Sequence, residues 1–136
     1  MTSESIFTTP HVPISWGELI DKITILEIKS SKITATIAND NIKKELLYLS
    51  DIAHSAMAQE EVHSLKKDLT DVNFKLWDVE DDIREKEFAG EFDSVFIELA
   101  RSVYMLNDVR AKIKKAINKV LKSELVEEKS YKDFEG

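Results

Sequence analysis

The stretch VHSLKKDLTDVNFKLWDVEDDI, residues 62–83, carries the clearest periodic pattern in the chain. Apolar side chains recur in it at alternating spacings of three and four residues: Val62, Leu65, Leu69, Val72, Leu76, Val79 and Ile83. This is the a and d pattern of three consecutive heptads, which places these side chains along one stripe of a helix. The stretch therefore predicts a long helix that packs against other helices.

The residues after this stretch predict a turn and another long helix. Gly90 is placed to take the left-handed conformation that commonly ends a helix, and Asp93 can cap the next helix, with Phe92 and Ile97 as a hydrophobic staple. Helical spacing then continues through Phe96, Leu99, Val103, Leu106, Ile113, Ile117 and Leu121. We expect this helix to run for about 28 residues, or roughly 42 Å.

Upstream, a helix is expected to open at Ser15, which forms a capping box with Glu18. Its apolar stripe is Leu19, Ile23, Leu26, Ile33 and Ile37. Ile25 and Ile28 lie off this stripe, which indicates a helix buried from two directions, by its own chain or by a second subunit. The cluster at 39–41 is expected to end this helix and to cap another, carrying Ile42, Leu46, Leu49, Ala53 and Met57. Residues 58–61 fit either a turn or a continuation.

The sequence thus predicts an all-α fold, an antiparallel helical bundle of about four long helices with coiled-coil-like packing. Its predicted organisation is an N-terminal arm at 1–14, a helical bundle domain at 15–122 and a C-terminal tail at 123–136, which forms either a short helix or an extension along the bundle. A length of 136 residues with 43% hydrophobic residues suffices for one domain with its own core. The 3 Gly and 2 Pro beside 33% charged residues disfavour an all-β fold.

Composition also narrows the classes of function. The chain has no Cys, which excludes disulfides, thiolate zinc sites and a cysteine nucleophile and fits a reducing compartment. Its N-terminus lacks the pattern of a secretory signal, and no apolar run reaches the roughly 20 residues that span a bilayer. The net charge of -7 disfavours binding to nucleic acid or to an anionic membrane. We expect a cytoplasmic protein.

Four blocks of the chain carry a resemblance: ISWGELIDKITILEIKSSKI at 14–33, LWDVEDDIREKE at 76–87, FIELARSVYMLNDVRAKIKKAIN at 96–118 and EEKSY at 127–131. In the same order, they resemble a bacterial and phage family without an assigned activity, domain of unknown function family 6165. The resemblance is weakest at 39–67. It implies a small helical domain, found alone or beside larger proteins of cell-surface glycan assembly, and it assigns no catalytic residue.

Polar residues at positions that face the predicted core are the best candidates for a site, because burying them is costly unless each finds a partner. We single out Glu27, Asn73, Trp77, Glu80, Arg84, Asn107 and Arg110. One hypothesis is that they converge in a cleft and bind an anionic or polyhydroxylated ligand, with Arg84 and Arg110 as forked donors and Trp77 or Trp16 stacking on a sugar or base. The favoured interpretation is that Arg110 pairs internally with Glu80 or Glu27 and fixes helix register.

Two other charged clusters receive structural interpretations. The acidic run from Asp78 to Glu87, with Glu98, suggests a magnesium site. Helical nucleotide pyrophosphohydrolases hold Mg²⁺ with carboxylates from two helices, but Arg84 and Arg101 stand where that pattern needs acids. A solvated face is therefore favoured for the acidic run. The lysines at 112, 115, 119 and 122 read as a solvated helix face. Neither the histidines nor the serines show a metal-binding or nucleophile motif. We predict no metal and no cofactor.

The sequence favours a helical binding or assembly module without enzymatic activity, which self-associates through apolar surface on its first or heptad-bearing helix. We expect a homo-oligomer, most simply a dimer, with a different protein as the other candidate partner. The link to glycan assembly is a further expectation from the resemblance. The alternative is a small ligand-binding domain or enzyme that takes a nucleotide or sugar phosphate in a cleft between helices.

Overall fold

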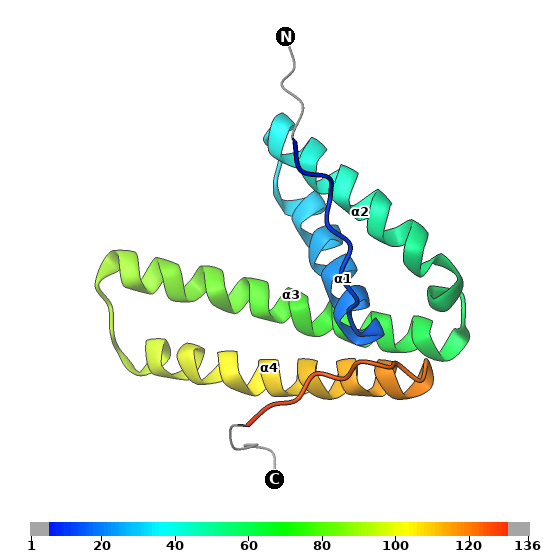
Figure 1. Ribbon diagram of the computed structural model, residues 1–136. Coiled ribbons are helices and arrows are strands. Elements are labelled where there is room, and N and C mark those ends of the chain that lie inside the picture. The colour runs from blue at the N-terminus through cyan, green and yellow to red at the C-terminus, as the bar shows by residue number, and fades with distance from the viewer. Residues whose placement is uncertain (1–5, 131–136) are drawn as a thin grey trace.

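A computed structural model describes residues 6–130, which form four helices and no strand. The helices are α1 (Trp16–Lys32), α2 (Thr36–Met57), α3 (Glu60–Ala89) and α4 (Ser94–Val120). α3 and α4 form a long antiparallel hairpin, α1 crosses this hairpin, and α2 lies along α1 (Figure 1). The fold is therefore an all-α helical bundle, as predicted, in which one helix pair crosses the other.

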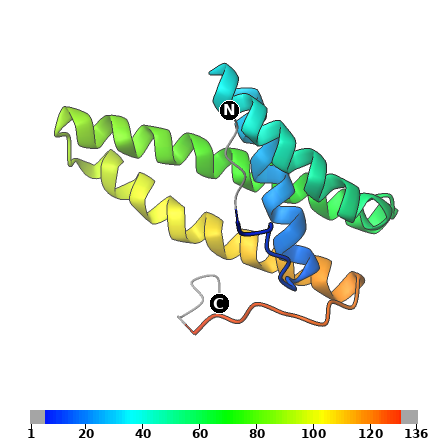
Figure 2. The ribbon, with the colours of Figure 1, turned by 45° about the horizontal axis from the view of Figure 1, so that its top comes forward.

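The crossing covers only one half of the hairpin. Figure 2 agrees with Figure 1 in showing that the far halves of α3 and α4 extend beyond α1 and α2. In α3 the last buried residue is Leu76, thirteen residues before the helix ends. The heptad stripe continues past it, but Val79 and Ile83 are only half-buried because α4 alone packs against them there. We call residues 78–105 the distal hairpin.

The start of α1 packs directly on the backbone of α4. The Ser15 hydroxyl caps the helix by accepting a hydrogen bond of 3.1 Å from the Glu18 amide, as predicted. The Glu18 carboxylate, however, binds Lys114 Nζ at 2.7 Å. The Gly17 amide donates to Asn118 Oδ1 at 2.7 Å, and a Cβ at Gly17 would lie 2.4 Å from the Lys114 carbonyl oxygen. This close approach requires glycine.

The predicted end of the first helix was wrong. α1 ends at Lys32 and α2 begins at Thr36, so the cluster at 39–41 lies inside α2. Asn39 Nδ2 donates to the carbonyl oxygens of Ser30 at 3.0 Å and Ile33 at 2.9 Å. The side chain thus satisfies acceptors that the end of α1 leaves without partners. Ile37, assigned from spacing to the first stripe, is 79% exposed.

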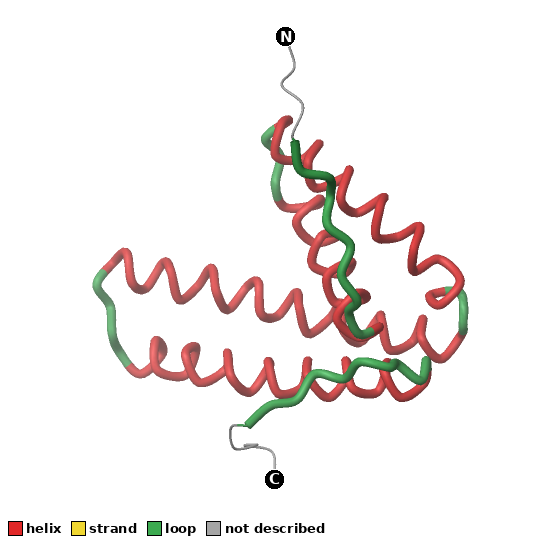
Figure 3. Tube along the Cα trace, viewed as in Figure 1, coloured by secondary structure: helices red, strands yellow, loops and turns green. Residues whose placement is uncertain are grey.

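The remaining connections mostly follow the sequence (Figure 3). Residues 58 and 59 form a short turn between α2 and α3. Gly90 ends α3 with φ of 69°, in the left-handed region, and Asp93 caps α4 by accepting from the Phe96 amide at 3.0 Å. The staple prediction was wrong, because Phe92 packs edge-on against Phe96, with ring centroids 5.2 Å apart, while Ile97 is exposed.

The core lies where α1 crosses the hairpin. Its main cluster joins Ile20 of α1 to α3 and α4, and a second cluster joins Leu19 and Ile23 to Ala53 of α2. After α4 the chain runs back along that helix without regular structure through residue 130 (Figure 1). Predictions for residues 1–5 and 131–136 lie outside the described part of the chain. Within that part, no helix is both long enough and apolar enough to cross a membrane.

Candidate functional site

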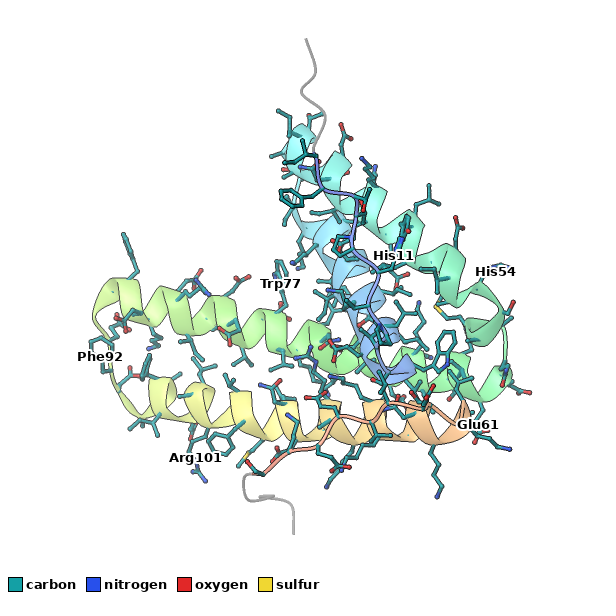
Figure 4. All side chains as sticks on the ribbon, viewed as in Figure 1. His11, His54, Glu61, Trp77, Phe92 and Arg101 are labelled. Atoms are coloured by element: carbon teal, nitrogen blue, oxygen red, sulfur yellow. The ribbon has the colours of Figure 1, made fainter. Side chains whose placement is uncertain are left out.

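A groove of about 580 Å³ lies in the angle between α1 and the upper side of the hairpin. Its lining, which we call the crossing groove, is Ile25, Ile28, Asn73, Leu76, Trp77, Glu80, Asp81, Arg84, Asn107 and Arg110. Six of the seven site candidates predicted from the sequence are among these residues. Figure 4 shows Trp77 on the side of α3 that faces α1. The predicted convergence of polar side chains therefore occurs at this place in the fold.

Glu27 is the predicted residue that does not line the groove. It lies on α1 where that helix passes over α3, and its Oε1 is 3.0 Å from Lys66 Nζ. The Glu27 side chain is 42% exposed in this pair. An ion pair with that exposure adds little to stability, so Glu27 has the character of a surface residue.

Beneath the groove lies a buried polar network centred on Asp21, which is 1% exposed. Arg110 donates through Nε to Asp21 Oδ1 at 3.0 Å and through Nη2 to Oδ2. Asn73 Nδ2 lies 2.9 Å from both Asp21 Oδ1 and Thr24 Oγ1, and the Thr24 hydroxyl donates to the Asp21 carbonyl oxygen at 2.7 Å. The network therefore joins α1, α3 and α4 at their crossing.

The internal partner of Arg110 is Asp21, and the sequence-based choice of Glu80 or Glu27 was wrong. The hydrogen bonds to Asp21 raise the pKa of Arg110, against the opposing effect of burial. Asp21 could have been found from spacing, because Gly17, Asp21, Thr24 and Ile28 follow one another at four, three and four residues along one helix face. That face turns toward the hairpin, and all four residues are buried.

The pairing with Asp21 determines what the groove can offer a ligand. The Nε and Nη2 groups of Arg110 both donate to the Asp21 carboxylate, and its Nη1 donates to Asn107 Oδ1 at 3.3 Å. Arg110 therefore has little capacity left for a ligand. Arg84 makes no hydrogen bond or ion pair with any residue between 6 and 130, so its guanidinium is free to donate. The carboxylates of Glu80 and Asp81 lie on the same wall. The groove thus combines a half-buried tryptophan with donors and acceptors of both charge signs.

The other charged clusters behave differently. Lys86, near the end of the acidic run, binds Glu91 at 3.0 Å and Asp93 at 2.9 Å across the connection between α3 and α4. Across residues 6–130, no three His, Asp or Glu side chains are grouped so that they could hold a metal ion. Lys114 bridges Glu18 at 2.7 Å and Glu127 at 2.8 Å.

Comparison with known proteins places the chain by sequence. The sequence model of a family of unknown function, DUF6165, matches residues 10–134, which is nearly the whole chain and includes all four helices. No protein with a curated description and no solved structure matches significantly. The chain therefore belongs to the DUF6165 family of unknown function.

Proposed function

We propose that the chain is a binding module that holds a small polyhydroxylated ligand, a sugar or a sugar carrying one acidic group, in the crossing groove. The observation that carries this proposal is the free Arg84 beside Trp77 in a concave site. The groove volume of about 580 Å³ lies within the usual range for small-molecule sites, roughly 300–1,000 Å³. Trp77 supplies an apolar face with a polar edge for stacking.

The charges of the groove favour a sugar over a polyphosphate. Glu80 and Asp81 offset the two arginines that line it, and the buried carboxylate of Asp21 holds the fork of Arg110. A nucleotide with several phosphates would meet one free guanidinium and two carboxylates. Hydroxyl groups, in contrast, both donate and accept hydrogen bonds. The ligand class also agrees with the link to glycan assembly that the family resemblance predicts, which itself stays a prediction.

Tryptophan fluorescence can report on the crossing groove alone, because only one of the two tryptophans of the chain lines it. Trp77 lines the crossing groove and Trp16 does not, so the variant Trp16→Phe leaves Trp77 as the sole tryptophan. We expect its emission to change saturably on titration with hexoses, aminosugars, uronic acids or sugar monophosphates. Arg84→Gln should weaken the best ligand at least about tenfold, as expected for loss of roughly 1.5 kcal/mol from a charged hydrogen bond.

The matched control is Arg101→Gln, which removes an exposed arginine of α4 that lies outside the groove lining. It should leave the affinity unchanged. The proposal fails if no sugar of these classes gives a saturable signal, or if Arg84→Gln and Arg101→Gln alter the affinity equally. Circular dichroism of each variant establishes that the helices are intact.

We infer self-association as a second function, through the distal hairpin and with a second copy of the chain as partner. Phe88 is 96% exposed, and Phe92, Val95 and Ile97 are also exposed at this end of the molecule. The apolar residues with which α3 and α4 pack on each other are only half-buried here, because no third helix covers them. A second hairpin packed on this surface would complete a four-helix arrangement.

Light scattering coupled to gel filtration tests this second proposal over a range of protein concentrations. The wild-type mass should rise toward that of a dimer, and Phe88→Glu should shift the transition to at least tenfold higher concentration. The control Leu47→Glu changes an exposed apolar residue of α2, far from the distal hairpin in the fold. A monomer at all concentrations would contradict the proposal, as would equal effects of the two variants.

A further inference from the structure

A second and larger cavity, of about 780 Å³, lies at the N-terminal half of α1, whereas the crossing groove lies against its C-terminal half. Its walls are residues 10–14 of the arm, the first turns of α1, the middle of α2 and residues 123–125. We call it the arm cavity. It shares no lining residue with the crossing groove, so what it binds is independent of the function proposed above.

Exposed apolar side chains gather around the arm cavity. Val12 is 72% exposed and Ile52 55% exposed, and Ile14, Tyr48 and Leu125 on the same lining are exposed as well. Trp16, Leu19 and Leu49 continue the apolar lining inward. Single exposed apolar residues are ordinary on protein surfaces, but several around one concavity mark a binding site. The lining therefore fits an apolar body of small-molecule size.

The polar and charged residues in the lining of the arm cavity are His11, Ser15, Glu18, Lys22, Tyr48, Ser123 and Glu124. Lys22 of α1 has no hydrogen-bond or ion-pair partner among the residues that the structure describes. Glu18 shares Lys114 with Glu127, and its Oε2 lies 2.7 Å from Lys114 Nζ. Glu124 belongs to the C-terminal segment at the edge of the cavity. Of the lining residues, Lys22 alone is a lysine or arginine, and it stands on α1.

The arm forms a wall of this cavity and is tied to α2. His11 Nε2 lies 3.3 Å from the Tyr48 hydroxyl, and their rings are 6.4 Å apart between centroids. On the opposite side, the Ser123 hydroxyl accepts from the Trp16 amide at 3.2 Å and fixes the C-terminal segment at the start of α1. The cavity is therefore enclosed by two extended segments that are each anchored to helices.

We propose that the arm cavity binds a single-chain amphiphile with an acidic head group, such as an alkyl carboxylate or alkyl phosphate. The aliphatic chain lies along the apolar lining between Trp16 and Ile52, and the head group pairs with Lys22. Such a ligand satisfies the free cation and covers the exposed apolar side chains in one step. The two glutamates of the lining disfavour a polyanion.

Fluorescence quenching distinguishes the two cavities because each holds one of the two tryptophans. The probe is a brominated dodecanoate below its micelle concentration, whose bromine quenches tryptophan on contact. In Trp77→Phe, which keeps Trp16, we expect saturable quenching. In Trp16→Phe, which keeps Trp77, emission should not change. Lengthening the unbrominated competitor by two carbons should tighten competition up to about fifteenfold, since each buried CH₂ contributes about 0.8 kcal/mol.

Two matched variants of α2 test the apolar lining. Ile52→Asp places a charge in the arm cavity and should weaken dodecanoate at least tenfold. Leu47→Asp introduces the same charge at another exposed apolar position of α2, outside the lining, and should leave binding unchanged. Both positions are exposed, so neither variant removes a core side chain.

The head group is tested at Lys22. Lys22→Gln should weaken dodecanoate and dodecyl phosphate up to about fivefold, the factor given by about 1 kcal/mol of exposed charge attraction, and should leave dodecanol unaffected. Lys44→Gln on α2 is the control. Equal quenching of the two tryptophans would reveal adsorption over the whole surface and overturn the proposal. Absence of saturable binding, equal effects of the two α2 variants, or tighter binding of dodecylamine than of dodecanoate would overturn it too.

Discussion

At the scale of single residues, Asp21 holds three helices together. Its carboxylate lies on α1, accepts two hydrogen bonds from Arg110 of α4 and another from Asn73 of α3. A buried pair of this kind contributes little net energy compared with a well-packed apolar pair, because both groups lose their hydration. Its stronger effect is on specificity, since one partner without the other leaves a buried charge unpaired.

We expect Asp21→Asn to lower the free energy of unfolding by about 3 kcal/mol, because Arg110 stays half-buried without its carboxylate. The double change Asp21→Leu with Arg110→Met should recover stability to within about 1 kcal/mol of the native chain, since buried ion pairs are often replaceable by apolar residues. Urea unfolding followed by circular dichroism measures both. The exposed pair supplies the control: Glu27→Gln should change stability by less than about 1 kcal/mol. An Asp21→Asn variant no less stable than Glu27→Gln would refute the network's role.

At the scale of elements, the sequence predicts helices better than it predicts their partners. The heptads of α3, the cap at Ser15 and the stop at Gly90 are local signals, and each appears in the structure. The end of α1 has no such signal. Spacing alone carried its stripe across the break to Ile37, and the residue that satisfies the helix end, Asn39, acts from the following helix. Contacts between distant residues decide such ends, and a single sequence does not display them.

The same limit applies to the candidate site. Six of the candidates chosen by helical spacing line one groove, because a side chain's face on a helix follows from its position. The partner of Arg110 depends on how α1 crosses α4. Residues 21 and 110 are far apart in the chain, and periodicity gives no information on that crossing. The arm cavity was not predicted for a related reason. Two of its walls are the extended segments 10–14 and 123–125, which have no periodic pattern in the sequence.

The C-terminal segment should detach from α4 in acid. Its Glu127 carboxylate binds Lys114 Nζ at 2.8 Å, and this hydrogen bond lowers the pKa of Glu127 below its ordinary value of 4.5. A lowered pKa means that the contribution is complete above pH 4.5 and is lost as the pH falls through the value in the folded protein. Because Glu127 is largely exposed, we expect less than about 1 kcal/mol.

Amide chemical shifts of residues 123–130 measured against pH provide the test. They should move toward random-coil values below pH 4.5, and Glu127→Gln should produce the moved shifts already at neutral pH. Glu124→Gln serves as the control, because Glu124 lies on the same segment but outside the Lys114 bridge. Shifts that stay constant down to pH 3 would contradict the prediction.

At the scale of the whole molecule, the two halves of the hairpin formed by α3 and α4 differ in how many helices pack against them. The near half of α3 contributes Val62, Leu69 and Val72 to the main core, where α1 and α4 both pack against it. In the distal hairpin each helix packs against the other alone, and most of the polar residues are exposed. Local stability follows the number of buried apolar contacts, so the hairpin should not open as one unit.

Hydrogen exchange followed residue by residue tests this asymmetry. In dilute protein, we expect amides of residues 78–105 to exchange at least about tenfold faster than those of 62–76 and 106–117, a difference of about 1.4 kcal/mol in opening free energy.

Self-association through the distal hairpin predicts that hydrogen exchange also depends on protein concentration. If another copy covers the distal hairpin, its protection should rise with protein concentration while the near half stays constant, because only the associated state gains stability by mass action. Phe88→Glu should remove the concentration dependence and keep the difference between the halves. Uniform protection along the hairpin in dilute protein would show that the crossing of α1 does not set local stability.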